Sequence, residues 1–115
     1  MDDVYKLREY GRHSVVAFQT SSLMNPVEVE RLRADLVRLV DEEKRTPLVL
    51  DFRRVQYFSS QVIGIILTLS KKLSALPGGK LVLCGVAPQL LELLKISRLD
   101  RILTIKADRK EAIRE

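Results

Sequence analysis

Two adjacent serines, Ser59 and Ser60, are the side chains whose type and position most clearly suggest chemistry. They follow a short apolar run that ends at Asp51 and precede an apolar pattern with helical spacing. A hydroxyl at the start of a helix commonly caps it. The same position also tolerates a phosphate, because free N–H groups and the positive end of the helix dipole stabilise an anion there. The position therefore predicts either a helix cap or a hydroxyl that can be modified.

Four other features suggest chemistry but favour structural roles. Asp51 has no neighbouring histidine or second carboxylate, so we expect it to bind loop amides rather than act as a general base. Gly78–Lys80 lacks the upstream glycine and the following Ser or Thr of a phosphate loop, so it should end a helix. Cys84 is centred in an apolar run, which predicts an inert thiol. His13 lies at a predicted hairpin, and we expect it to be exposed and solitary.

The composition is that of one folded domain, expected over residues 1–115. Hydrophobic residues make up 46% of the chain and charged residues 30%, a balance that argues against disordered and collagen-like classes. A chain of 115 residues is too short for two ordinary domains. Cys84 and His13 are each the single residue of their type, so neither a disulfide framework nor a Cys/His zinc site is available. We therefore expect no metal or cofactor and a reducing, cytoplasmic location.

The charged residues carry a positive excess without a nucleic-acid signature. Twenty Lys and Arg against fifteen Asp and Glu give a net charge of +5, which favours acidic partners through long-range attraction. The basic residues are scattered and are not interleaved with the aromatic residues that stack on bases, so we expect no nucleic-acid partner. The apolar run 62–67 is far shorter than the roughly 20 residues that cross a bilayer, so no membrane span is expected.

Short β-like runs alternate with helical patterns along the whole chain. Strands joined by crossover helices form right-handed βαβ units, so the expected fold class is α/β, with a mixed, mostly parallel sheet of about five strands. An N-terminal hairpin begins the sheet, and the helices pack against it. Asn25 and Pro26 mark one helix start. The expected strands are 4–10, 14–18, 48–52, 80–84 and 101–106, and the expected helices are 26–44, one that opens at 59–60 and one that opens at 88.

Residues 50–67 resemble the signature segment of the STAS domain, the fold of bacterial anti-sigma factor antagonists. That signature is a strand ending in Asp, a hydrophobic turn, and then Asp-Ser-Ser/Gly-Gly-Leu-Gly at the start of a helix. In register, Asp51 matches the strand-end Asp and Gly64 matches the last Gly. Ser60 falls on the serine that the family phosphorylates, with Ser59 as the second candidate. The resemblance implies a regulatory protein that binds a partner and is no enzyme.

The resemblance extends over most of residues 4–107, with differences at the signature. Residues 84–88 and 99–103 look like two further family segments, a strand-to-helix turn and a closing Leu-Asp-x-Ile-Leu. Ser59 stands where the family usually has Asp, and Gln61-Val62 replaces a small Ser/Gly-Gly pair. These differences remove a carboxylate beside the expected phosphoacceptor and add bulk after it, which implies a different partner surface.

The resemblance implies a protein partner of the anti-sigma factor or Ser/Thr kinase class, with other STAS proteins as a further class, and a switch by phosphorylation of Ser60. Two alternatives stay open: a constitutive scaffold module in which Ser60 is not modified, and a domain that binds a small ligand, either a nucleotide or a hydrophobic molecule. Gly64 lies one turn after Ser60 and leaves room for a partner. The expected partner-binding residues are Ser59, Ser60, Gln61, Gly64, Ile65, Thr68 and Lys72.

Overall fold

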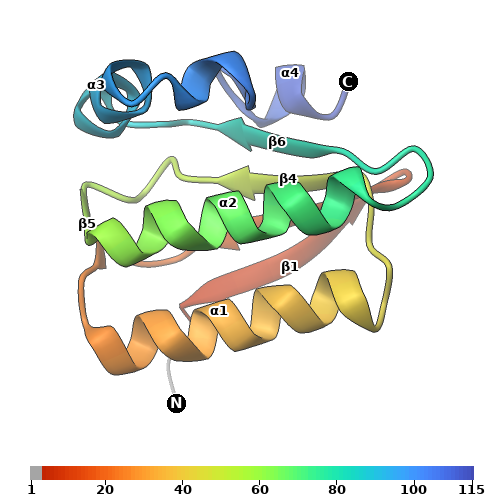
Figure 1. The fold of residues 1–115 in the computed structure, drawn as a ribbon, viewed down its shortest axis with the longest axis horizontal. Helices are drawn as coiled ribbons and strands as arrows, with labels where there is room; N and C mark the ends of the chain where they lie inside the picture. The colour runs from red at the N-terminus through yellow and green to blue at the C-terminus, as the bar shows by residue number, and fades with distance from the viewer. Residues whose placement is uncertain (1–3) are drawn as a thin grey trace.

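A five-stranded sheet forms the centre of the protein, seen here in a computed structural model that describes residues 4–115 (Figure 1). Of the expected domain 1–115, residues 1–3 lie outside the described part. The strand order is β1-β2-β4-β6-β7, in which β1 is antiparallel to β2 and all other neighbours are parallel. The expected mixed, mostly parallel sheet is therefore confirmed. The strands are β1 (Tyr5–Tyr10), β2 (His13–Phe18), β4 (Leu48–Asp51), β6 (Leu81–Cys84) and β7 (Thr104–Lys106).

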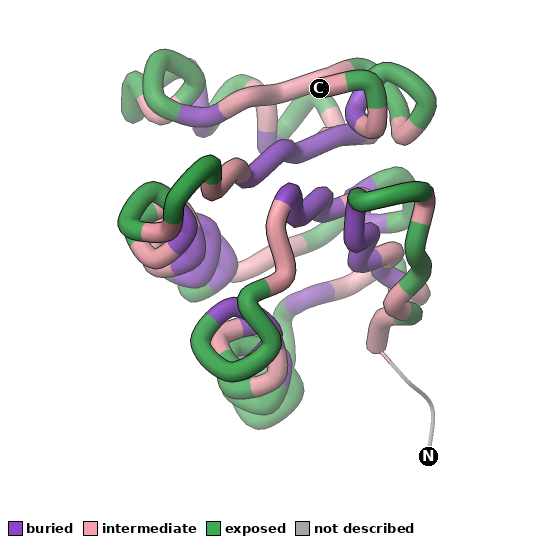
Figure 2. The backbone as a smooth tube through the Cα atoms, turned by 90° about the vertical axis from the view of Figure 1, so that its right-hand side faces the viewer, coloured by how far each residue is buried: buried purple, intermediate pink, exposed green. Residues whose placement is uncertain are grey.

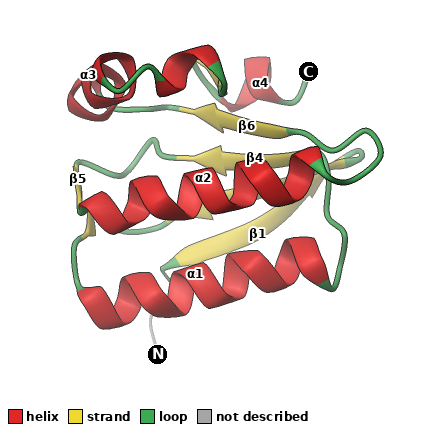
Figure 3. Cartoon of the chain, viewed as in Figure 1, coloured by secondary structure: helices red, strands yellow, loops and turns green. Residues whose placement is uncertain are grey.

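In the described part of the chain, four helices and one short 3-10 turn connect and cover these strands (Figure 3). The first helix is well specified, because the Asn25 side chain accepts hydrogen bonds from the amides of Val27 at 2.9 Å and Glu28 at 3.1 Å. The last strand, expected over 101–106, comprises only Thr104–Lys106, because residues 99–101 form the 3-10 turn. The helices are α1 (Pro26–Asp41), α2 (Ser60–Ser74), α3 (Pro88–Ile96) and α4 (Arg109–Ala112), and the turn is η1 (Leu99–Arg101).

The two faces of the sheet are covered unequally. Leu48 and Leu50 on β4 point into a large apolar core shared with α1, α2 and α3. Val49 points to the opposite face, where a smaller cluster is closed by Ala112 of α4. Figures 1 and 2 both show α1 and α2 side by side along one face, and these two helices pack directly on each other. The opposite face is therefore covered only in part.

A second, two-stranded sheet lies at the end of the molecule where α1 and α2 begin (Figure 1). It pairs β3 (Ser22–Leu23) with β5 (Tyr57–Phe58) in parallel. The amide of Ser59 donates to the carbonyl oxygen of Leu23 at 3.0 Å and continues this pairing to the edge of α2. The small sheet thus fixes where the second helix starts.

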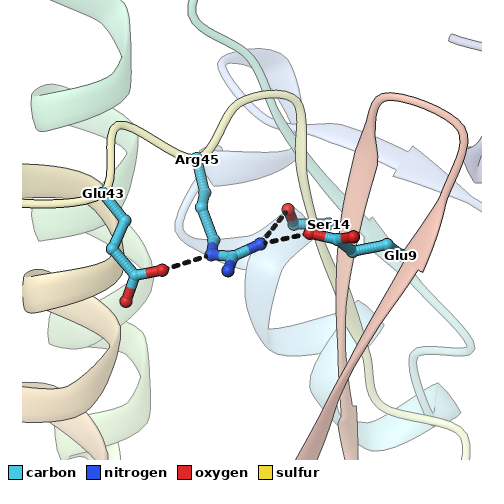
Figure 4. Close-up of polar contacts among 4 residues, drawn as sticks. All are labelled: Glu9, Ser14, Glu43 and Arg45. Carbon is cyan, nitrogen blue, oxygen red and sulfur yellow. Dashed lines mark hydrogen bonds and ion pairs between the residues drawn. The ribbon is translucent and has the colours of Figure 1, made fainter.

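A polar cluster ties the loop after α1 to the N-terminal hairpin (Figure 4). The Arg45 guanidinium donates to Glu9 at 2.8 Å, to Glu43 at 2.8 Å and to the hydroxyl of Ser14 at 3.2 Å. The hydrogen bonds to the Glu9 and Glu43 carboxylates, that to Glu9 first, raise the pKa of Arg45 above its usual value. The cluster joins two segments that are far apart in sequence and so helps to hold β2 beside β4.

His13 differs from its predicted exposure. It is the first residue of β2, only 5% of its surface is exposed, and its Nε2 has no hydrogen-bond partner within residues 4–115. The expectation failed because the hairpin turn consists of Gly11 and Arg12 alone, which draws His13 into the strand and against the sheet. Gly11 adopts φ +62°, the left-handed conformation that such a short turn requires.

Candidate functional site

Ser60 is an exposed residue at the first position of α2. The residue before it, Ser59, has the extended backbone of a helix cap (φ −94°, ψ 166°), yet its side chain makes no capping hydrogen bond. The Ser59 hydroxyl oxygen is buried and has no partner within the part of the chain that the structure describes. The two serines therefore differ: Ser59 occupies the cap position, while the neighbouring Ser60 reaches solvent.

The start of α2 is electrostatically open to an anion. No acidic residue lies in its first turn, and its two basic residues, Lys71 and Lys72, lie in the last turn. The free amides of the first turn give this end of a fifteen-residue helix partial positive charge. Because the residue directly before Ser60 is a serine, no carboxylate immediately precedes Ser60 to oppose added negative charge. A phosphate on Ser60 would be stabilised locally by about 0.3–1 kcal/mol.

Two of the expected partner-binding residues share this open surface with Ser60. Gln61 is exposed, and Gly64 is exposed one helical turn further on. A Cβ atom added at Gly64 would meet no other atom within 4 Å. The glycine is therefore not required by packing inside the chain, and its surface is open for an approaching molecule.

The other three expected partner-binding residues are less exposed than a partner-binding role requires. Ile65 was expected to be exposed, but only 4% of its surface is exposed and it belongs to the main core. Lys72 is half-buried and binds Asp41 of α1 at 3.0 Å, and Thr68 is half-buried. The physical reason is that α2 packs on α1 as well as on the sheet, so the stripe that continues through Ile65, Thr68 and Lys72 faces a neighbouring helix instead of solvent.

Three exposed apolar side chains lie at the same end of the molecule as Ser60 and were missed by the sequence analysis. Met24 follows β3, Val27 lies in the first turn of α1, and Tyr57 lies on β5, with exposed fractions of 49%, 63% and 60%. Figure 1 shows that these elements meet where α1 and α2 begin. In the sequence, these three apolar residues lie outside the apolar stripes of the predicted helices, and this could have indicated that they are exposed. We call Met24, Val27, Tyr57, Ser60, Gln61 and Gly64 the Ser60 surface.

Other candidate chemical groups have structural roles. Asp51 accepts a hydrogen bond from the backbone amide of Arg53 at 3.0 Å, as expected for a carboxylate that binds loop amides. Burial, and then the nearby Asp51 carboxylate, raises the pKa of Cys84 to about 12, so this thiol stays protonated near neutral pH, as its predicted inertness requires. Within residues 4–115, no group of three or more His, Cys, Asp or Glu side chains is placed to hold a metal ion, and no helix has the length and apolarity to span a membrane.

The fold and the Ser60 surface define a class of α/β domain with a solvent-facing hydroxyl at the start of its second helix. The family model of the STAS domain matches residues 6–112, and the chain belongs to this family. A relative from Bordetella bronchiseptica, BtrV, is named as a candidate anti-sigma factor antagonist. It is 33% identical over 90 residues, which cover 78% of this chain and 76% of BtrV.

Solved structures of STAS proteins share the fold. A domain from Planctomyces limnophilus, described as an anti-sigma-factor antagonist, superposes with a TM-score of 0.80 at 20% identity, covering 94% of this chain and 92% of its own. The Bacillus cell fate determinant SpoIIAA in its phosphorylated form has a TM-score of 0.71 at 22% identity, covering 95% of this chain and 96% of its own. At these identities the likeness shows the architecture and confirms the predicted fold.

Proposed function

We propose that this protein is a non-enzymatic regulatory domain that binds an anti-sigma factor or Ser/Thr kinase through the Ser60 surface and is switched by phosphorylation of Ser60. The observation that carries the proposal is the exposed hydroxyl at the first position of α2, beside Gly64 and three exposed apolar side chains. The relative SpoIIAA is known in an unphosphorylated and a phosphorylated form, which supports the same type of switch here.

The proposed switch acts on the interface and leaves the domain folded. A phosphate adds roughly −1.5 to −2 charge at a helix start that stabilises anions, so the domain should remain intact. At an interface the same charge causes repulsion or desolvation, and each 1.4 kcal/mol of lost binding energy weakens affinity about tenfold. Because Met24 and Tyr57 are apolar and exposed at this end of the molecule, a partner that buries them would also desolvate the phosphate.

Phosphorylation is tested directly with the cognate anti-sigma kinase and ATP. We expect one phosphate on Ser60, detected by mass spectrometry, and complete loss of labelling in Ser60→Ala. Ser74→Ala is the matched control, since Ser74 is an exposed serine at the other end of the same helix and should leave labelling unchanged. Label on Ser59 or any other residue in the wild-type protein would contradict the proposed site.

Partner affinity gives a second prediction. Ser60→Asp should weaken binding to the kinase about tenfold, whereas Ser60→Ala and the control Ser74→Asp should bind like the wild-type protein. Isothermal titration calorimetry measures the four dissociation constants, those of the three variants and of the wild-type protein. The scaffold alternative, which the bulky Gln61-Val62 pair favours, predicts equal affinity for all variants. Equal dissociation constants would therefore contradict the switch and support constitutive docking.

A further inference from the structure

We propose that a basic groove on the second face of the sheet binds a compact small molecule through its phosphate or carboxylate groups. The groove has a volume of about 460 Å³ and lies between the β1–β2 hairpin and α4, on the face opposite α1 and α2. This site is separate from the Ser60 surface and does not depend on phosphorylation. The five cationic side chains that line it are Arg8, Arg53, Arg54, Arg109 and Lys110.

The fold gathers these cations from three distant parts of the sequence. Arg8 stands on β1 opposite Val15, so its side chain shares the face of the smaller apolar cluster. Arg53 and Arg54 follow the end of β4, and Arg109 belongs to α4. Because α4 packs on β4, β6 and β7 and closes the cluster that contains Val15, the exposed Arg8 of β1 lies at the margin of the area that α4 covers. A charge excess that is scattered in the sequence is therefore concentrated around one concavity.

The positive charge of the five cations is not fully neutralised by carboxylates of the chain. Two carboxylates, Asp51 and Asp108, also line it, and both already accept backbone hydrogen bonds, Asp51 from Arg53 at 3.0 Å and Asp108 from Glu111 at 2.9 Å. Within residues 4–115, none of the five cations has a carboxylate partner within 4 Å, although seven ion pairs occur elsewhere in that part. Five positive charges against two negative ones favour an anionic occupant.

The guanidinium of Arg109 is held in place by Tyr10, but one of its N–H donors has no acceptor within residues 4–115. Its Nη1 donates a hydrogen bond to the Tyr10 hydroxyl, and its central carbon lies 4.5 Å from the centroid of the Tyr10 ring. Its Nε is buried and has no partner within the described residues. Buried donors are normally paired, and this unpaired donor belongs to a side chain that lines the groove. The planar guanidinium binds both phosphate and carboxylate oxygens through paired N–H donors.

The aromatic residues in the groove favour a compact anion over a nucleotide. The groove volume lies within the range of about 300–1,000 Å³ that small-molecule sites show. One face of Tyr10 is covered by Arg109, and the ring also packs against the smaller apolar cluster. Phe18 is buried and its ring packs on Phe52 with centroids 4.8 Å apart. Both aromatic rings among the lining residues are thus already engaged within the chain, so recognition of the ligand rests on its oxyanion groups.

Calorimetry on the full chain at low ionic strength tests the proposal, with pyrophosphate and citrate as probes of the phosphate and carboxylate chemistries. We expect saturable binding of one of them, about tenfold weaker in Arg109→Gln and in Arg54→Gln, because each variant removes a charge-assisted hydrogen bond. Lys71→Gln, which removes an exposed cation on α2, is the matched control and should bind like the wild-type protein.

NMR of the wild-type protein provides a second measurement that needs no variant to fold. The amides of Gly85 and Ala107, which line the groove, should shift on titration, while that of Gly64 should not. Absence of binding by both probes, unchanged affinity in both arginine variants, or an equal loss in Lys71→Gln would overturn the site. Tighter binding of ATP or of an acidic peptide than of both probes would overturn the compact-anion assignment.

Discussion

Replacing Gly79 with alanine is expected to lower the free energy of unfolding by about 3 kcal/mol or more. A Cβ atom at this position would lie 1.7 Å from the carbonyl oxygen of Leu73 and 2.7 Å from its carbonyl carbon. Both are backbone atoms of α2, so no side-chain rotation relieves the overlap. Gly79 also donates its amide to Leu76 at 2.9 Å, and any shift that avoids the clash disturbs this turn between α2 and β6.

The adjacent Gly78 provides the matched control. It adopts φ +68°, which alanine rarely does, but a Cβ atom there meets nothing within 4 Å. Gly78→Ala should therefore cost only about 1 kcal/mol, from backbone strain alone. Urea denaturation followed by circular dichroism measures both variants, with equal m-values required for the comparison. Equal losses in the two variants would show that backbone conformation, and not the contact with Leu73, determines the requirement for glycine.

The sequence predicted the main elements because each has a strong local signal. Asn25 and Pro26 specify the start of α1 through capping and a preset φ angle, and the structure confirms the cap. The apolar runs of β4 and β6 are buried on both faces, as expected for central parallel strands. Such signals depend only on residues that are close together in the sequence, so they can be recognised without the structure. The two-residue strands β3 and β5 are too short to have a period, so their pairing could not be predicted.

The candidate site was predicted less completely, because exposure depends on how elements pack together. The position of Ser60 at a helix start follows from local pattern. The spacing of the α2 residues predicts which of them share a stripe, but it does not predict that α1 covers the stripe containing Ile65 and Lys72. The same limit applies to the basic groove, whose cations come together only when α4 returns to β4.

Ile65→Ala should destabilise the domain by about 3 kcal/mol, because the side chain is 4% exposed and its truncation leaves a cavity in the main core. Ile63→Ala is the matched control on the same helix. Ile63 is only partly buried, so its truncation should cost about 1 kcal/mol. Urea denaturation measures both losses.

This comparison separates a core role from a partner-binding role for Ile65. If Ile65 packs beneath α1, the folded fraction of Ile65→Ala should bind the partner with wild-type affinity, because the truncated atoms never reach the interface. A variant with wild-type stability and weakened binding would contradict the buried position of Ile65. The Ser60 surface would then extend along the Ile65, Thr68 and Lys72 stripe, which requires α1 to move away from α2. Because Lys72 binds Asp41 at 3.0 Å, Asp41→Asn would in that case strengthen partner binding, whereas a fixed α1 leaves affinity unchanged.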